Sequence, residues 1–137
     1  MDKGYIKHSD IIRTIGNSND EILGNIIKLY VPSGKFDIDP TYCRGGFYKS
    51  CVIPKPEFVS DINVKCGVDT FDCRGLPFVD GSADSIIFDP PFSFGTDKVN
   101  KYEKSTSLGF AGTFEQLQSL YMLSLLEFYR ILKNVEY

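Results

Sequence analysis

Residues 82–95 read SADSIIFDPPFSFG, and this stretch shows where a buried strand ends. Its apolar run at 86–88 is typical of a strand that is covered on both faces. The two prolines after Asp89 have no N–H to donate to a neighbouring strand, so the strand ends there. The chain therefore places a carboxylate, a rigid proline pair and the aromatic Phe92 at the carboxyl end of a core strand.

Three other short apolar stretches end in a similar way. Together with the stretch described above, they give four predicted strands: KFDID at 35–39, FVSDINV at 58–64, GVDTFDC at 67–73 and DSIIFD at 84–89. Each has an acid at or near its carboxyl end, namely Asp39, Asp61, Asp72 and Asp89. Short buried strands between helices predict an α/β fold with a parallel sheet. Ligands of such sheets bind outside the carboxyl ends of the strands, so we expect the four acids to converge on one crevice.

Two helices are indicated by capping boxes. SNDE at 18–21 opens a helix whose apolar residues follow a helical period, and Pro32 with Gly34 ends it. TFEQ at 113–116 opens the longer helix 114–132, which is apolar around most of its circumference. A surface helix would show a polar face, so we expect this one to be buried on more than one side.

Composition is that of one soluble globular domain. The 137 residues are 42% hydrophobic and 24% charged, and no run approaches the ~20 apolar residues of a membrane span. The first ten residues lack the apolar core of a signal peptide, so a cytoplasmic location is expected. The net charge of −3 argues against a broad phosphate-binding surface, although Lys98, Lys101 and Lys104 form either a local basic patch or a solvated loop.

The four cysteines form no CxxC pair, and the chain has one histidine. We therefore expect no metal site and no disulfide, only reduced thiols.

The spacing of the acids suggests specific contacts. Gly45 and Gly46 follow Asp39 and allow a close approach of backbone to ligand. Asp61 comes 22 residues after Asp39, which is the spacing that places a carboxylate on ribose hydroxyls. Asp72 is a candidate acceptor for an exocyclic amine. Each acid taken alone is as well explained as a turn residue, and only the set of four makes a pattern.

The set DPTYCRGGFY, SDIN, DCRGLPF, SADSIIFDPPF and EFYRILKN, in this order, resembles the S-adenosylmethionine-dependent amino-methyltransferases. Within these it resembles the bacterial and phage DNA methyltransferases that modify an exocyclic base nitrogen. The resemblance spans residues 20–134 and implies a Rossmann-like methyltransferase fold, a parallel sheet with flanking helices, as a single domain over residues 1–137.

The resemblance also implies the site residues. The loop around the methionine part of S-adenosylmethionine would be formed by Asp39, Pro40, Thr41 and Gly45. Asp61 would hold the ribose, and Asp72 with Cys73 would contact the adenine. The catalytic tetrapeptide would be Asp89, Pro90, Pro91 and Phe92. Family members commonly have glycine at the position of Cys43, where a β-carbon would crowd the cofactor.

This chemistry explains the ending of the strand. An exocyclic base amine is a poor nucleophile, because its lone pair is delocalised into the ring. The Asp89 carboxylate and the Pro90 carbonyl can each accept one of its hydrogens, and Phe92 can stack on a base flipped out of the duplex. The proline pair holds these groups rigid, so little reorganisation accompanies methyl transfer.

Four strands are fewer than the seven of the family, and no target-recognition region is found. We therefore expect a domain that is truncated at its C-terminal side, with helix 114–132 covered by a partner chain or by a second copy.

Several functions stay open. The favoured target is adenine N6 in DNA, the alternatives being cytosine N4 in DNA and guanine N2 in RNA. A different alternative is a non-catalytic remnant that binds cofactor or a partner and transfers nothing.

Overall fold

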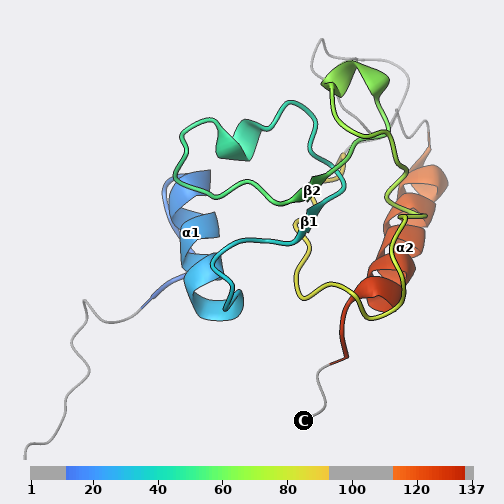
Figure 1. Cartoon of the computed structure of the whole chain (residues 1–137). Coiled ribbons are helices and arrows are strands. Elements are labelled where there is room, and N and C mark those ends of the chain that lie inside the picture. The colour runs from blue at the N-terminus through green and yellow to red at the C-terminus, as the bar shows by residue number, and fades with distance from the viewer. Residues whose placement is uncertain (1–11, 93–112, 135–137) are drawn as a thin grey trace, which may run out of the picture.

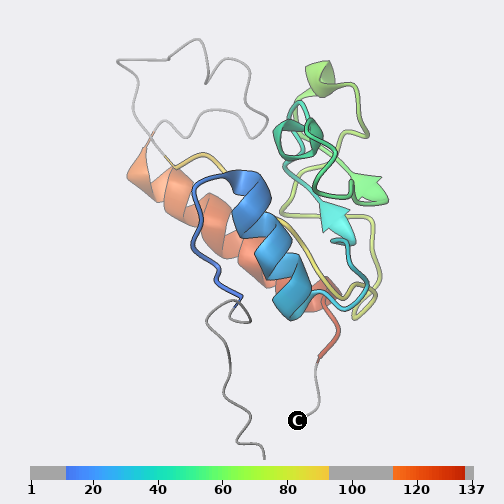
Figure 2. The ribbon, with the colours of Figure 1, turned by 90° about the vertical axis from the view of Figure 1, so that its left-hand side faces the viewer.

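The computed structural model describes residues 12–92 and 113–134, which form a mixed α/β arrangement. Helices α1 (Asn19–Tyr30) and α2 (Phe114–Ile131) lie on opposite sides of a two-stranded parallel sheet of β1 (Ile38–Asp39) and β2 (Phe58–Val59) (Figure 1). In a view turned by 90°, the two helices slant the same way across the molecule (Figure 2). The predicted loop lysines 98, 101 and 104 lie outside the described residues.

Both predicted helices are confirmed, and their first turns show why they begin where they do. The Thr113 hydroxyl accepts from the Gln116 N–H while the Gln116 side chain accepts from the Thr113 N–H, which completes the capping box of α2. Ser18 caps α1 in the same way, but the Glu21 carboxylate accepts from the N–H of Asn17 instead of Ser18. The predicted capping box of α1 is therefore only half formed.

The sheet continues beyond its two named strands through single parallel bridges. Ile38 pairs with Phe58 on one side and with Ile86 on the other, and Ser60 pairs with Asp69. The paired segments thus lie in the spatial order 69, 58–60, 38–39 and 86, all parallel. Their carboxyl ends therefore face the same edge.

The strands are shorter than predicted, and the residues at their ends explain this. The stretch 58–64 turns after Ser60, because the Asp61 side chain accepts from the N–H of Asn63 and the Asn63 side chain accepts from the N–H of Lys65. Val64–Cys66 is a 3₁₀ helix, η3, instead of strand. The predicted strands 67–73 and 84–89 are reduced to single bridges at Asp69 and Ile86, and a further bridge joins Ala83 to Leu132. The 3₁₀ helix η2 (Gly46–Tyr48) follows the glycine pair.

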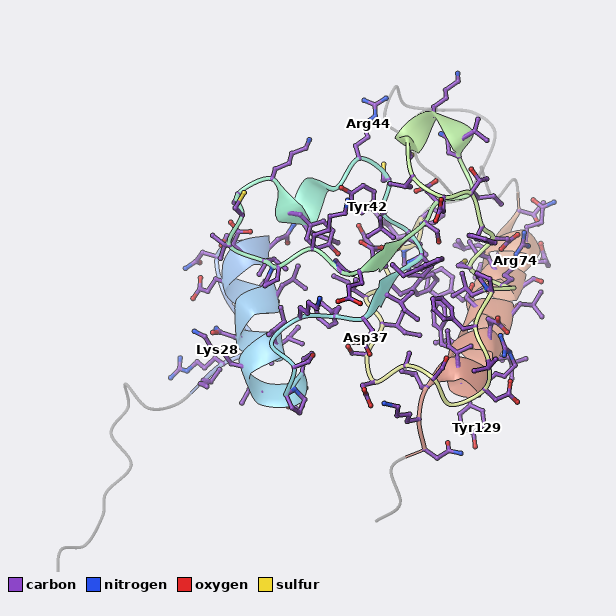
Figure 3. All side chains as sticks on the ribbon, viewed as in Figure 1. Lys28, Asp37, Tyr42, Arg44, Arg74 and Tyr129 are labelled. Atoms are coloured by element: carbon purple, nitrogen blue, oxygen red, sulfur yellow. The ribbon has the colours of Figure 1, made fainter. Side chains whose placement is uncertain are left out.

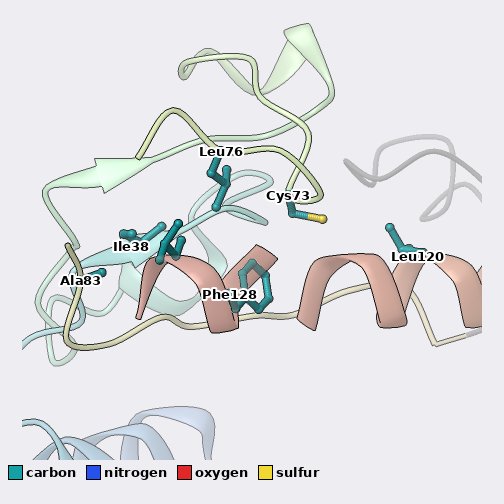
Figure 4. Packing of buried hydrophobic residues seen from close by; sticks show 7 residues of the cluster. Ile38, Cys73, Leu76, Ala83, Leu120 and Phe128 are labelled. Carbon is teal, nitrogen blue, oxygen red and sulfur yellow. The ribbon is translucent and has the colours of Figure 1, made fainter. Parts of the chain in front are cut away.

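Alternating residues divide the core between the two helices. Ile38, Ile86 and Phe88 face α2, where they pack with a cluster drawn in Figure 4 that includes Leu120, Phe128 and Ile131. Phe36 and Ile87 belong instead to the cluster that α1 contributes to, with Ile27 and Val31. Side chains of successive strand residues point to opposite faces, so each helix covers its own face of the sheet.

Arg130 fixes α2 to the loop that leads into the last bridge. Its guanidinium donates to the carbonyl oxygens of Leu76 and Phe78 and to the carboxylates of Asp80 and Glu127. Glu127 also accepts from the N–H of Leu76. These contacts hold the 76–81 loop against the helix.

Candidate functional site

Asp39, the last residue of β1, has a buried carboxylate that accepts three hydrogen bonds. Its Oδ1 accepts from the N–H of Thr41 at 3.0 Å and from the Thr41 hydroxyl at 3.4 Å, and its Oδ2 accepts from the Tyr48 hydroxyl at 2.7 Å. Burial outweighs these hydrogen bonds and raises the pKa of Asp39 to about 6. Burial, together with the neighbouring Asp39, also raises the pKa of Tyr48.

The turn after β1 needs two left-handed residues. Gly45 has φ of 66°, and a β-carbon there would collide with the hydroxyl of Tyr42. Cys43 has φ of 52°, in a region that favours glycine, at the position where the resembling family commonly has one. Figure 3 shows Tyr42 and Arg44 beyond one end of the strands, with Asp37 near the other end.

Asp61 is fully buried at the end of β2. Its Oδ2 accepts from the N–H of Cys43 at 2.7 Å, and its Oδ1 accepts from the N–H of Asn63, also at 2.7 Å. Burial, and next the charge of the neighbouring Asp61, raise the pKa of the Cys66 thiol to about 12. The carboxylate thus ties the turn after β1 to the residues after β2.

Asp72 and Cys73 contact other parts of the chain. Asp72 accepts from the N–H of Arg74 and forms a bidentate ion pair with the Arg74 guanidinium. The hydrogen bonds from the Arg74 side chain lower the pKa of Asp72. Cys73 is fully buried, and its sulfur lies 3.1 Å from the hydroxyl of Ser124 in α2. The Cys73 side chain therefore faces the core and is not open to a ligand.

The tetrapeptide at 89–92 is anchored at both ends. The N–H of Asp89 donates to the Thr41 hydroxyl at 2.9 Å, and the carbonyl of Pro91 accepts from the Tyr121 hydroxyl at 3.1 Å. The Tyr121 ring also meets Phe88 edge to face, at 6.0 Å between centroids. Phe92 is 90% exposed, so its ring faces outward.

The carboxylate of Asp89 differs from the three others. Asp39, Asp61 and Asp72 each accept from the N–H two residues later, which is the geometry of an Asx turn. The residue two positions after Asp89 is Pro91, which has no N–H. Within residues 12–92 and 113–134, no donor bonds to the Asp89 carboxylate or to the Pro90 carbonyl. Although Asp89 is exposed as a residue, partial burial of its carboxyl group raises its pKa.

The loop 41–43 brings three of the four predicted acids together. Thr41 bonds to Asp39 and to the Asp89 N–H, and Cys43 bonds to Asp61. The Asp72 carboxylate accepts instead from the N–H and the guanidinium of Arg74. Sequence reasoning missed Tyr48 and Tyr121, because neither stands at a strand end and the pairing of each depends on the tertiary fold.

Searches for other kinds of site were negative for the described residues. In residues 12–92 and 113–134 no three histidine, cysteine or acidic side chains are placed to share a metal ion. Neither described helix is long and apolar enough to cross a membrane. Comparison of the chain with protein-family models, with curated proteins and with solved structures gave no match.

Proposed function

We propose that this chain is an S-adenosylmethionine-dependent methyltransferase domain that acts on an exocyclic amine of a DNA base, with adenine N6 the favoured target. The observation that carries the proposal is the pair of acceptors at the end of the 84–89 segment. The Asp89 carboxylate and the Pro90 carbonyl have no donor among the described residues, and the exposed ring of Phe92 follows them. An amine with two hydrogens and a flat base attached to it suits this arrangement.

The order of the paired segments supports a Rossmann-like arrangement of the sheet. Taken in chain order, the segments at 38–39, 58–60, 69 and 86 lie in space as third, second, first and fourth. This matches the first four positions of the doubly wound order 3-2-1-4-5-6, whose ligands bind where the strand order reverses, here between the segments at 38–39 and 86. The Thr41–Asp89 hydrogen bond lies at that point.

The hydrogen-bonding groups of these residues match the parts of S-adenosylmethionine that they would contact. Asp39, Pro40, Thr41 and Gly45 would surround its methionine part, Asp61 its ribose hydroxyls, and Asp72 with the Cys73 backbone its adenine. A carboxylate oxygen accepts more than one hydrogen bond, so Asp61 retains acceptor capacity beside Cys43 and Asn63. Because Asp61 is fully buried, a ribose hydroxyl would reach it only after a displacement of the residues that cover it. The bound cofactor supplies a methyl group on a positively charged sulfur.

The residues of the tetrapeptide would act on the base. Accepting the two amine hydrogens on Asp89 and Pro90 draws the nitrogen toward tetrahedral geometry and frees its lone pair for the methyl group. Phe92 would stack on the base, which must leave a duplex to reach it. The bonds from Asp89 to Thr41 and from Tyr121 to Pro91 hold the acceptors in place before the base arrives.

Cofactor binding is tested by thermal melts with S-adenosylhomocysteine. At ~100 times its dissociation constant, a ligand of the folded state adds about 2.7 kcal/mol to stability. We expect this shift in the parent chain and in Asp69→Asn, an exposed acid at the neighbouring segment, and its loss in Asp61→Asn. A cooperative melt of the parent that ignores the ligand contradicts the proposal and favours a non-catalytic remnant.

Catalysis is tested by transfer of a labelled methyl group to duplex DNA, with single-stranded DNA and RNA in parallel. The Asp89→Ala variant should keep the thermal shift with S-adenosylhomocysteine and lose transfer. Transfer to RNA alone, or undiminished transfer by Asp89→Ala, contradicts the proposed role.

A further inference from the structure

A series of buried hydrogen bonds links the 3₁₀ helix η2 to the tetrapeptide at 89–92. The Tyr48 hydroxyl donates to Oδ2 of Asp39 at 2.7 Å, and the Thr41 hydroxyl donates to Oδ1 of the same carboxylate at 3.4 Å. The Thr41 hydroxyl also accepts from the N–H of Asp89 at 2.9 Å. Asp39, Thr41 and Tyr48 are all buried, where hydrogen bonds are stronger than in water. The series therefore connects the carboxylate of Asp39 to the first residue of the tetrapeptide.

Each of these bonds has a fixed donor while Asp39 is ionised. The N–H of Asp89 can only donate, so the Thr41 oxygen accepts from it and the hydroxyl hydrogen of Thr41 remains for Asp39. An ionised carboxylate only accepts, which matches the two hydroxyls that donate to it, those of Thr41 and Tyr48. The charge on Asp39 therefore sets the orientation of the hydroxyl to which the Asp89 N–H is bonded.

A proton on Asp39 disturbs this arrangement. The protonated carboxyl must itself donate, and the oxygens that its two oxygens meet are the hydroxyls of Thr41 and Tyr48. Whichever hydroxyl accepts that proton must turn its own hydrogen to another acceptor, and a buried donor without an acceptor is unfavourable. On the Thr41 side, the hydroxyl that turns is the one bonded to Asp89.

Asp39 changes its charge in an accessible range of pH. Burial raises its pKa to about 6, although the hydrogen bonds from Tyr48 and Thr41 lower it, and the charge of Asp89 raises it further. Tyr42, whose ring stacks on that of Tyr48 at 5.7 Å, is a further titratable group beside these residues. Asp39 therefore passes from the ionised to the protonated form as pH falls through about 6.

The bond to Thr41 fixes the start of the tetrapeptide. Asp89 supplies the carboxylate and Pro90 the carbonyl that would accept the two amine hydrogens, and the ring of Pro90 fixes its φ angle. A displacement of the Asp89 backbone therefore moves both acceptors together. The bond from Tyr121 to the Pro91 carbonyl lies on the other side of this pair and does not hold the Asp89 N–H.

We propose that Tyr48, Asp39 and Thr41 are positioning residues, which hold the Asp89 backbone in the geometry for amine methylation only while Asp39 is ionised. The inference rests on the proposed function for its chemistry. The coupling of Asp39 to the Asp89 N–H, in contrast, can be measured without any methyl transfer.

The coupling is tested by NMR of the full chain, on the amide of residue 89 between about pH 4 and pH 8. Asp89→Asn serves as the starting protein, because it keeps the N–H and removes the carboxyl group that would add its own titration. We expect one titration step of this amide, at or slightly below pH 6, because the charge of Asp89 no longer raises the pKa of Asp39. Adding Asp39→Asn or Thr41→Val should abolish the step, and adding Thr41→Ser should retain it.

Tyr48→Phe is the second variant, since it removes one hydroxyl and keeps the ring. The hydrogen bond that it loses lowers the pKa of Asp39, so the step should move to higher pH. Tyr30→Phe, at an exposed tyrosine, is the matched control and should leave the midpoint in place. The inference is overturned if the starting protein shows no step near pH 6, if the step survives Asp39→Asn, or if Tyr48→Phe does not move it.

Methyl transfer to duplex DNA then tests the role of these residues in the reaction. Transfer should fall as pH drops through about 6, and Tyr48→Phe should move this fall to higher pH without changing KM for S-adenosylmethionine. Thr41→Val should lower turnover about tenfold or more, and Thr41→Ser should retain most of it. A parent without transfer contradicts the proposed function, and the amide of residue 89 still decides the coupling. A parent that transfers with a pH profile unmoved by Tyr48→Phe overturns the positioning role.

Discussion

The two strand segments on either side of β1 each end in an aspartate, and the two aspartates have different hydrogen-bond partners. After β2, the sequence Asp-Ile-Asn lets the third residue return its N–H to the carboxylate of Asp61, and Cys43 supplies a second N–H. After the bridge at Ile86, the sequence Asp-Pro-Pro offers no N–H, and the carboxylate of Asp89 has no donor among the described residues. A strand-end acid thus closes a turn when an N–H follows it two residues later, and has no such local donor when prolines follow it.

The largest effect should come from removing the structural acid. Asp61→Ala removes the acceptor of the N–H groups of Cys43 and Asn63, which are both half-buried. Each such group costs about 1–3 kcal/mol, so the free energy of unfolding should fall by about 4 kcal/mol in urea titrations. Asp69→Ala, at an exposed acid, should change it by less than about 0.5 kcal/mol. An equal effect of both variants would remove the distinction between buried and exposed acids.

Asp39 should make stability depend on pH in an unusual direction. Burial raises its pKa from the ordinary 3.8 to about 6, so the folded state binds a proton more tightly than the unfolded state. The stability from this group is complete below pH 3.8 and is lost as pH rises through about 6.

At 1.36 kcal/mol per pKa unit, the loss amounts to about 3 kcal/mol. Asp39→Asn should lack it, and unfolding measured from pH 4 to pH 7 should show a difference between parent and variant that grows with pH. A constant difference would mean that Asp39 titrates normally.

A smaller effect should follow from loosening the tetrapeptide. Tyr121→Phe removes the hydroxyl that donates to Pro91 but keeps the ring against Phe88. We expect a loss of about 1 kcal/mol in the free energy of unfolding. Methyl transfer, where present, should fall without a change in the affinity for S-adenosylhomocysteine. Tyr129→Phe is the matched control, because the Tyr129 side chain is exposed.

Elements whose ends are determined by neighbouring residues could be predicted from the sequence. The capping residues placed the start of both helices, and the prolines placed the end of the segment at 84–89. Strand lengths were wrong, since Asx turns at Asp61 and Asp72 end the pairing earlier than the apolar pattern suggests. The bond from Thr41 to Asp89 joins residues 48 apart in the chain, and no local pattern predicts such a contact.

Four acids that are alike in sequence differ in the hydrogen-bond donors around them. In the sequence, Asp39, Asp61, Asp72 and Asp89 have the same place at a strand end. The N–H donors around them separate three that close turns from Asp89, whose carboxylate has no donor among residues 12–92 and 113–134. The signal that distinguishes Asp89 was present as Pro91, whose missing N–H prevents the turn.

The most direct test of this account is the free energy of unfolding of Asp89→Ala, measured in urea beside Asp61→Ala at the same pH. The account predicts a change of less than about 0.5 kcal/mol for Asp89→Ala, against about 4 kcal/mol for Asp61→Ala. A loss in Asp89→Ala as large as that in Asp61→Ala would contradict it, because the Asp89 carboxylate would then be part of the structure and not an acceptor held free for a ligand.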